Sequence, residues 1–192
     1  MTDLFTHLAH GHRDQTSMDT AHAALIASVV LASKPARVLE LGVGTGYVSK
    51  AILLALRFNG RGSLTCVDDW HDWSGRRPVH IDGLEAMGAG IVLSSEAAFV
   101  RSCAAGHFDL VVSDADHFNA HQWFEDTLRL VAPSGVAFFH DTNQPEVFPG
   151  LATLPSRATE SGLPSRHYMA SSRGDERCDR GLLMVLNRPG QA

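Results

Sequence analysis

Acidic and histidine side chains stand together in two short stretches of the chain, Asp114-Ala115-Asp116-His117 and His140-Asp141. Carboxylates bind cations, and a histidine with an unperturbed pKa near ~6.5 takes up or releases a proton at neutral pH. Each stretch directly follows an apolar run typical of a buried strand. These residue types suit general base catalysis or a metal site, although an acid at a strand end also commonly caps the next helix.

A glycine-rich turn lies earlier in the chain, between an apolar run at 38–41 and helix-forming sequence at 48–56. Its three alternate glycines, Gly42, Gly44 and Gly46, allow a sharp turn and leave space for a ligand against the main chain. This arrangement is typical of a nucleotide-type binding loop. The alternative is a plain turn between strand and helix, with no ligand.

The spacing within this loop indicates which ligand it takes. A dinucleotide fingerprint reads G-x-G-x-x-G, but here Tyr47 occupies the position of its last glycine, and Gly46 comes one residue early. Glu40 precedes the glycines, and a carboxylate there repels phosphate but suits a ligand that carries an ammonium group. A pyrophosphate is therefore disfavoured, and a nucleotide ligand with an amino-acid part is favoured.

The surrounding sequence alternates strands with helices. The expected strands are 38–41, 64–67, 91–93, 108–113 and 136–139. The expected helices are 20–32 with Asp19 as its N-cap, then 48–56, 81–87, 96–104 and 120–131. This alternation predicts an α/β fold with a doubly wound, mostly parallel sheet. Two further apolar runs, 168–170 and 182–186, are expected to form an antiparallel hairpin at one edge, which makes seven strands.

Ligands of doubly wound sheets bind beyond the carboxyl ends of the strands, where the first strand lies beside the fourth. The glycine loop should therefore lie next to 114–117 and close to 140–141. The second expected strand ends in Asp68 and Asp69, and an acid in that place commonly binds ribose hydroxyls. The aromatic stretch at 70–73 that follows is expected either to cover an adenine ring or to fold a loop.

The remaining segments carry less pattern. Residues 1–18 are polar and rich in histidine, and we expect a loosely held terminal segment. Residues 143–180 contain scattered proline, glycine and serine, and they are long enough to form a lid over the site or to contact the substrate. No change of composition divides the chain, so residues 1–192 are expected to form a single domain.

The composition bounds the function. With 192 residues, 44% hydrophobic residues and a net charge of -5, the chain can bury one core and offers no basic surface for nucleic acid. No apolar stretch reaches the ~18 residues that span a bilayer, and the first residues lack the features of a signal peptide, so a cytoplasmic location is expected. Cys66, Cys103 and Cys178 are too far apart for a zinc or disulfide motif. A small-molecule acceptor is the expected partner.

Two motifs carry a resemblance to a known family. The pattern E-x-G-x-G-x-G at 40–46 resembles the first motif of the class I S-adenosylmethionine-dependent methyltransferases. The sequence FDLVVSDADH at 108–117 resembles the fourth-strand motif of the O-methyltransferases related to catechol O-methyltransferase, and it is also similar to sugar O-methyltransferases of antibiotic biosynthesis. The resemblance covers about residues 36–142.

The resemblance implies a Rossmann-like methyltransferase fold with S-adenosylmethionine as cofactor and an acceptor oxygen as the expected point of methylation. Ser95 is also expected to contact the cofactor. Ser94 or Ser95 is, in addition, the candidate N-cap of the expected helix 96–104. The residues expected to bind the cofactor are Glu40, Gly42, Gly44, Thr45, Gly46, Tyr47, Asp68, Asp69, Ser95 and Asp114.

The catalytic positions also follow from the resemblance. In the catechol-related group, the first aspartate of the fourth-strand motif binds Mg²⁺ and the residue three further on is a lysine base, and these positions are Asp114 and His117 here. Some sugar-branch members carry histidine at the base position. An acid at the end of strand five completes the metal site in the broader group, and Asp141 fits it. His117 is the expected base and His140 the reserve candidate.

The chain departs from the family pattern at two positions. Thr142 stands where the catechol enzymes have asparagine, and His140 stands where sugar-branch members have an acid. The expected metal ligands are Asp114, Asp141 and His140. Because Mg²⁺ prefers oxygen ligands, the histidine makes Mg²⁺ less favourable and leaves Mn²⁺, Fe²⁺ or no metal open.

Other functions remain open from the sequence. They are a protein that binds S-adenosylmethionine without catalysis, an N-methyltransferase, a nicotinamide-dependent oxidoreductase and a metal hydrolase. Tyr47 argues against the oxidoreductase, and a hydrolase would leave the glycine loop and Asp68 without a role. The sequence names neither the acceptor nor the oligomeric state, and a homo-oligomer stays open.

Overall fold

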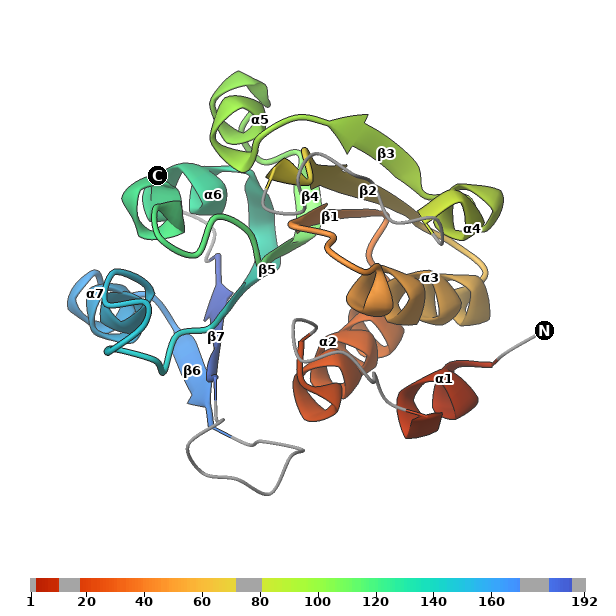
Figure 1. Ribbon diagram of the computed structural model, residues 1–192, viewed down its shortest axis with the longest axis horizontal. Coiled ribbons are helices and arrows are strands. Elements are labelled where there is room, and N and C mark those ends of the chain that lie inside the picture. Colours follow the sequence, from red (N-terminus) through yellow and green to blue (C-terminus); the bar gives the residue numbers. More distant parts are fainter. Residues whose placement is uncertain (1–2, 11–17, 72–80, 170–179, 188–192) are drawn as a thin grey trace.

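The computed structural model describes residues 3–10, 18–71, 81–169 and 180–187, and within them a seven-stranded sheet has the order β3-β2-β1-β4-β5-β7-β6 (Figure 1). The strands are β1 (Arg37–Leu41), β2 (Ser63–Asp68), β3 (Gly90–Leu93), β4 (Phe108–Ser113), β5 (Val131–His140), β6 (Ser165–Tyr168) and β7 (Leu182–Leu186). Strands β1 to β5 are parallel, and β7 runs antiparallel to both β5 and β6. The predicted fold class and the antiparallel edge are confirmed.

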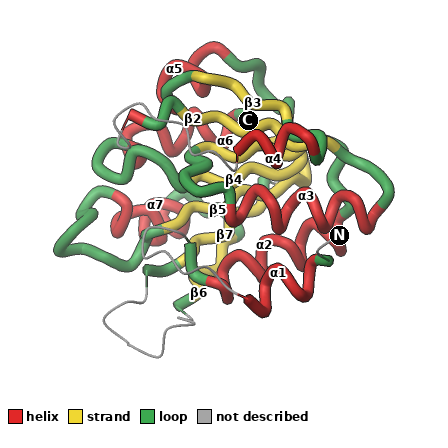
Figure 2. The backbone as a smooth tube through the Cα atoms, turned by 45° about the vertical axis from the view of Figure 1, so that its right-hand side comes forward, coloured by secondary structure: helices red, strands yellow, loops and turns green. Residues whose placement is uncertain are grey.

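Helices cover both faces of the sheet (Figure 2). They are α1 (Leu4–His10), α2 (Thr20–Ser33), α3 (Tyr47–Asn59), α4 (Ile81–Ala86), α5 (Glu96–Ser102), α6 (Phe124–Arg129) and α7 (Leu154–Glu160), with short 3-10 turns at Ala120–Trp123 and Leu151–Thr153. Residues of α1 to α4 share one hydrophobic core, and residues of α5 to α7 share the other. No helix in these described segments is both long and apolar enough to cross a membrane.

Strand β1 shows how the sheet directs its side chains. Val38 packs into the core that holds α2 and α3, whereas Leu39 and Leu41 pack into the core that holds α5 and α6. Because side chains alternate along a strand, Glu40 points to the same face as Val38. Both faces are buried, which explains why the strand is apolar except for this one acid.

Strands β1 and β4 end level with each other. Leu41 pairs with Ser113, so the glycine loop and the segment after β4 leave the sheet side by side. This is the change of winding direction predicted from the sequence, and it brings chemically useful residues from distant parts of the chain together.

The amino-terminal prediction needs correction where the structure describes it. Residues 4–10 form helix α1 rather than a loose segment; Leu4 is buried, and Nε2 of His7 lies within hydrogen-bond distance, 2.9 Å, of the Tyr47 carbonyl oxygen. Contacts with α2 and α3 stabilise this helix, although seven residues are too few to form a stable helix alone. Residues 11–17 lie outside the described residues.

The predicted helix 120–131 was also too long. Helix α6 ends at Arg129, and Val131 already belongs to β5, which runs to His140 through Pro133 and Gly135. The pairing of β5 with β4 shifts register opposite Phe108 to Leu110, which accommodates this irregular segment. Within 143–180, the structure describes α7 and β6 but not residues 170–179.

Candidate functional site

A pocket of about 820 Å³ opens at the carboxyl ends of β1, β2 and β4, a volume within the range of small-molecule and cofactor sites. Nine of the ten residues predicted to bind the cofactor line it, namely Glu40, Gly42, Gly44, Thr45, Tyr47, Asp68, Asp69, Ser95 and Asp114. Gly46 is the exception. Its Cα faces α4 instead, where an added Cβ would come within 2.8 Å of Cδ1 of Leu84.

The glycine loop touches the segment after β4. A Cβ built on Gly42 would lie 2.4 Å from the Asp114 carbonyl oxygen, and Gly42 has a φ of +81°, which other residues rarely adopt. Backbone hydrogen bonds tie the same region together, since Gly42 N–H donates to Val67 and Asp114 N–H donates to Leu41. Glycine is therefore required at position 42 both by conformation and by the close approach of two chain segments.

The carboxylate of Asp68 holds the loop from the other side. Its Oδ2 accepts hydrogen bonds from the N–H groups of Val43 (2.8 Å) and Gly44 (2.9 Å), and its Oδ1 accepts one from Trp70 N–H (2.6 Å). In a phosphate-binding loop, such N–H groups would face the ligand. Here a carboxylate already occupies them, which is physical support for the argument against a pyrophosphate.

Trp70 lines the pocket just after β2. Its side chain is buried, and its indole N–H donates to the Gly44 carbonyl oxygen at 3.1 Å. Of the two alternatives predicted for the aromatic stretch, Trp70 folds and supports the loop. The rest of that stretch, 72–73, lies outside the described residues.

Glu40 lies at the inner end of the pocket. It is 1% exposed, and Sγ of Cys66 lies 3.5 Å from its Oε2. Burial raises the pKa of Glu40 to about 8, so the carboxyl is largely protonated at pH 7 without a ligand. A cationic group placed beside it would favour the ionised form again, as expected for an ammonium partner.

Four side chains meet where β4 and β5 end. Nδ1 of His140 lies 2.9 Å from Oδ1 of Asp114, and Nε2 of His117 lies 2.9 Å from Oδ2 of Asp141 and 3.5 Å from Oδ1 of Asp114. His140 and Asp141 are almost completely buried, whereas the His117 side chain is 32% exposed. The structure thus brings together the predicted base, its reserve candidate and both expected carboxylate ligands.

The two aspartates determine the charge state of the histidines. Burial alone would lower the pKa of His117, but hydrogen bonds and charges from Asp114 and Asp141 outweigh it and raise the pKa to about 10. For His140 as well, the same carboxylates overcome burial and raise the pKa to about 10. The cluster without a ligand is therefore a compensated arrangement of two carboxylates and two imidazolium groups, in which His117 holds a proton at neutral pH.

The comparisons with known proteins identify the family. Residues 39–142, more than half of the chain, match a family model described as a methyltransferase domain. The chain belongs to this methyltransferase family. The matched range agrees closely with the predicted 36–142, and the predicted resemblance to catechol O-methyltransferase-like enzymes is confirmed.

Individual relatives agree with this assignment. Catechol O-methyltransferase domain-containing protein 1 of Mus musculus is 31% identical over 123 residues, which are 62% of this chain and 47% of that protein, so the match spans about half of the relative's length. An O-methyltransferase from Bacillus cereus in complex with SAH has a TM-score of 0.73 at 15% identity, covering 96% of this chain and 89% of the other. TomG, an O-methyltransferase from Streptomyces achromogenes involved in tomaymycin synthesis and solved with SAM, has a TM-score of 0.72 at 15% identity, covering 98% and 91%. The structural likenesses show the methyltransferase fold.

Two buried acids of this methyltransferase were not recognised from the sequence. Glu96 was expected only as the start of a helix that Ser95 caps, and Ser95 does accept a hydrogen bond from Ala98 N–H. Glu96 itself is buried, and its Oε1 accepts a hydrogen bond from the Ser113 hydroxyl at 2.8 Å. An acid in the first turn of a helix is usually solvated, so the sequence carries little signal for this burial.

Asp19 is the second such acid. It was predicted to cap α2, but its side chain makes no capping hydrogen bond and is fully buried, with Oδ2 lying 3.8 Å from Nδ1 of His22. Burial, followed by the charge of the nearby His140, lowers the pKa of His22 to about 4. The spacing of an acid and a histidine three residues apart at a helix start is the only sequence signal for this pair.

The close approach at Gly42 predicts a large effect of Gly42→Ala on stability. Gly60→Ala is a matched control, because Gly60 also has a positive φ (+67°) but a Cβ there would meet nothing within 4 Å. We expect Gly60→Ala to lower the free energy of unfolding by about 1–2 kcal/mol and Gly42→Ala by roughly 2–5 kcal/mol. Urea unfolding followed by circular dichroism measures both, and equal losses would contradict the steric contact.

Glu96 predicts a pH dependence of stability. Burial raises its pKa to about 8, so the folded protein keeps this proton while the unfolded chain, with an ordinary glutamate pKa, loses it. Its stabilising contribution is complete below about pH 4 and decreases as pH rises toward 8, by at most roughly 1.4 kcal/mol per pH unit.

Glu96→Gln should therefore become increasingly stable relative to the wild-type chain between pH 5 and pH 8, because glutamine keeps an acceptor for Ser113 but does not ionise. Urea unfolding at several pH values gives the difference. Glu160→Gln, at an exposed position in α7, is the control and should leave the profile unchanged. A constant difference between Glu96→Gln and wild type would contradict a buried, titrating Glu96.

Proposed function

We propose that this methyltransferase transfers a methyl group from S-adenosylmethionine to an oxygen atom of a small molecule. The observation that carries the proposal is a single pocket lined both by the glycine loop and by Asp114 and His117. The sulfonium of S-adenosylmethionine supplies an already activated methyl group. The protein therefore has to bind the cofactor, align an acceptor with the methyl and manage the acceptor's proton.

The pocket offers partners for each part of the cofactor. Glu40 lies at its inner end, where an ammonium group would restore the carboxylate that burial suppresses. Asp68 and Asp69 end β2 and would accept hydrogen bonds from ribose hydroxyls. Asp68 already accepts hydrogen bonds from two loop N–H groups through one oxygen. It would therefore shape the loop and also accept a further hydrogen bond from the ligand. Ser95 lines the far side, and its hydroxyl also caps α5.

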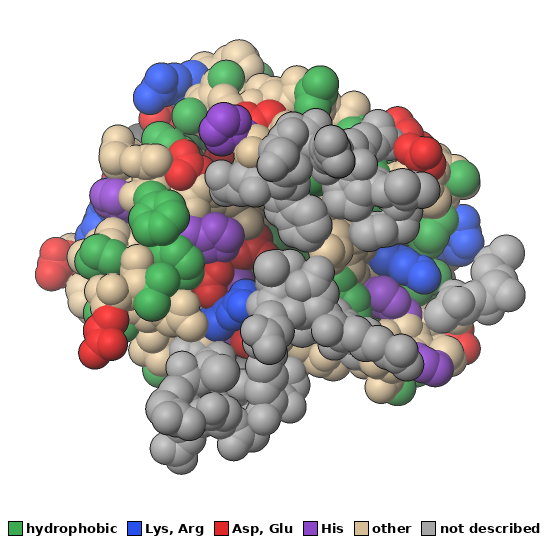
Figure 3. Space-filling model, in the orientation of Figure 1, with side chains coloured by type: hydrophobic (Ala, Val, Ile, Leu, Met, Phe, Trp, Pro, Cys, Tyr) green, Lys and Arg blue, Asp and Glu red, His purple; other side chains and the backbone are tan. Residues whose placement is uncertain are grey.

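The acceptor would bind beside His117. The imidazole of His117 stacks on the Phe148 ring at a centroid distance of 4.9 Å. Phe118 contacts Phe148 edge to face, and its own side chain is 70% exposed. Hydrophobic, histidine and acidic side chains adjoin one another on the face seen in Figure 3. An acceptor with an apolar body and a hydroxyl group would match this combination.

His117 is the proposed base. Its ring reaches the pocket and remains partly accessible to water, so a proton can leave it for solvent. Without a ligand it already holds a proton, because Asp114 and Asp141 raise its pKa. Loss of that proton must therefore precede its action as a base, and His140, which is fully buried, is less well placed for proton exchange.

A divalent cation is compatible with the same cluster. Asp114 and Asp141 would supply oxygen ligands and Nδ1 of His140 is the expected nitrogen ligand, since donor atoms of these three residues lie within 4.8 Å of one another. This mixed set suits Mn²⁺ or Fe²⁺ better than Mg²⁺. A bound cation would lower the pKa of the acceptor hydroxyl and, by neutralising the carboxylates, that of His117. As the chain is folded here, Nδ1 of His140 is already engaged with Asp114.

Cofactor binding can be tested by calorimetric titration with S-adenosylhomocysteine and, separately, with NAD. We expect binding of S-adenosylhomocysteine and none of NAD, because Asp68 occupies the loop N–H groups. Glu40→Gln should weaken the binding of S-adenosylhomocysteine by about 10- to 100-fold through loss of a charge-assisted hydrogen bond, whereas the surface variant Glu160→Gln should bind normally. Tighter binding of NAD, or no binding of S-adenosylhomocysteine, would refute the proposal.

The role of His117 can be tested by turnover. His117→Ala should lower the rate of S-adenosylhomocysteine formation with catechol or hexose acceptors by roughly 10²- to 10⁴-fold, while the affinity for S-adenosylhomocysteine stays close to that of wild type. The exposed His107, at the opposite end of β4, provides the control His107→Ala. Measurements with EDTA, Mg²⁺ or Mn²⁺ separate metal-dependent from metal-free catalysis. Wild-type turnover in His117→Ala would exclude it as the base.

A further inference from the structure

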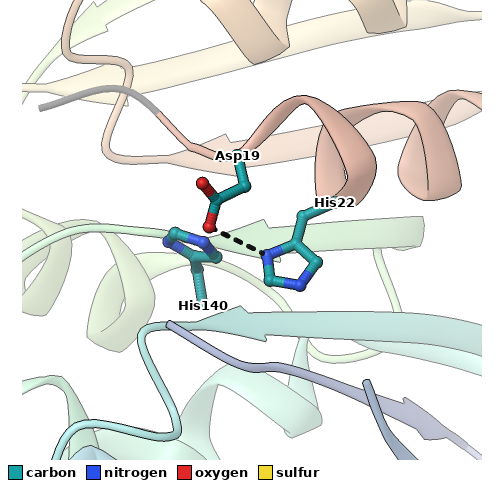
Figure 4. A group of neighbouring side chains, drawn as sticks. All are labelled: Asp19, His22 and His140. Atoms are coloured by element: carbon teal, nitrogen blue, oxygen red, sulfur yellow. Dashed lines mark ion pairs between the residues drawn. The ribbon is translucent and has the colours of Figure 1, made fainter. Parts of the chain in front are cut away.

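A second group of chemically active side chains lies behind the methyltransferase pocket. Asp19 and His22 come from the start of α2, and His140 comes from the end of β5 (Figure 4). Their exposed fractions are 0%, 1% and 2%, and one potential ligand atom from each lies within 4.8 Å of the others. The rings of His22 and His140 are 5.3 Å apart and nearly perpendicular, at 78°.

The histidine nitrogens of this group lack hydrogen-bond partners. Among the described residues, neither ring nitrogen of His22 has a hydrogen-bond partner, and neither has Nε2 of His140; Nδ1 of His22 lies 3.8 Å from Oδ2 of Asp19. A buried polar atom without a partner costs about 1–3 kcal/mol. Two buried histidines with unpaired ring nitrogens, each offering one ligand atom within 4.8 Å of a buried carboxylate, point to a ligand that binds imidazole nitrogen.

The orientation of His140 favours a metal ion as that ligand. Its Nδ1 lies 2.9 Å from Oδ1 of Asp114, so Nδ1–H donates to the carboxylate; a metal ion would take the place of the proton that the imidazolium carries on Nε2. A histidine that binds a metal through one nitrogen commonly donates its other N–H to a carboxylate, which fixes the ring and strengthens it as a ligand. Asp114 and His140 have this relationship, Nε2 has no hydrogen-bond partner among the described residues, and Asp19 and His22 lie nearby.

We propose that Asp19, His22 and Nε2 of His140 form a buried binding site for a divalent transition-metal ion, with Zn²⁺ as the best match. Two imidazoles and one carboxylate are typical zinc ligands, whereas Mg²⁺ favours oxygen ligands throughout. Ligand atoms around tetrahedral Zn²⁺ lie about 3.4 Å apart, given bonds of ~2.0–2.1 Å. The donors here would have to move together by about 1 Å, which rotations of the three side chains can supply.

This site is distinct from the cation site considered beside the acceptor. There His140 would bind through Nδ1 and release Asp114, whereas here it binds through Nε2 and retains the hydrogen bond to Asp114. Asp114, Asp141 and His140 were the expected ligands of an acceptor-side cation. If His140 binds the buried metal instead, only Asp114 and Asp141 of these three remain for that cation. The buried metal would join α2 to β5 and hold Asp114 in place from behind.

The experiment uses the full chain without an affinity tag, stripped of metal with a chelator and dialysed. We expect it to bind one Zn²⁺ per chain, measured by elemental analysis after gel filtration, and Zn²⁺ to raise the thermal unfolding temperature. Co²⁺, as a spectroscopic substitute, should give visible absorption bands of a four-coordinate site with nitrogen and oxygen ligands. Mg²⁺ should produce neither effect.

Variants locate the ion. His22→Asn and Asp19→Asn should each lose the bound Zn²⁺ and the Co²⁺ bands. Asp141→Asn, which removes a carboxylate beside His140 but none of the three proposed ligands, and His10→Asn, at an exposed position of α1, should retain them. Circular dichroism and binding of S-adenosylhomocysteine establish that His22→Asn is folded. If that variant does not fold, Asp19→Asn and the Co²⁺ spectrum of the wild-type chain still decide the question.

Two results would overturn the proposal. One is retention of stoichiometric Zn²⁺ by both His22→Asn and Asp19→Asn. The other is the absence of Zn²⁺ binding, or its loss in Asp141→Asn alone, which would assign the ion to the acceptor-side cluster. Binding of S-adenosylhomocysteine is measured independently in every variant, so failure of the metal site is distinguishable from failure of the proposed methyl transfer.

Discussion

The hydrogen bonds from the glycine loop to Asp68 are the interaction on which the site depends. One carboxylate oxygen accepts the N–H groups of both Val43 and Gly44, and the other accepts that of Trp70. These bonds fix the loop, and the Trp70 indole N–H adds a hydrogen bond to the Gly44 carbonyl oxygen. They also place a carboxylate on N–H groups that could otherwise face an anion, which disfavours a phosphate at this loop.

Charge compensation governs the opposite side of the pocket. Asp114 and Asp141 lie close together in a buried place, and the imidazoles of His117 and His140 neutralise them at distances of 2.9 Å. Asp141 has a φ of 56°, an unusual conformation for a residue other than glycine, and Asp116 and Trp70 around the same pocket share this feature. These backbone conformations cost free energy. The packing of the two cores on the faces of the sheet must supply more stabilisation than this cost.

The sequence predicted the features that depend on local patterns. The alternation of apolar strands with helices gave the sheet, and the glycine spacing with Glu40 gave the cofactor side of the pocket. Features that depend on packing were not predictable. Helix α1 is stabilised by contacts with α2 and α3, and Val131 belongs to β5 because tertiary packing outweighs a helical pattern. Trp70 could not be assigned from the sequence, since its burial requires the Gly44 carbonyl oxygen that only the folded loop presents.

His140 connects the pocket to the interior behind it. Its side chain is completely buried. Nδ1 lies 2.9 Å from Asp114 and 3.4 Å from Asp141, Nε2 has no hydrogen-bond partner among the described residues, and Asp19 and His22 lie nearby. A ring with two hydrogen-bonding nitrogens transmits polarisation, since a group that withdraws electron density at Nε2 makes Nδ1–H a stronger donor. A metal ion bound at the start of α2 would therefore act on Asp114 through the His140 ring. A histidine at this position makes that coupling available, because an imidazole has two nitrogens that can bind separate groups.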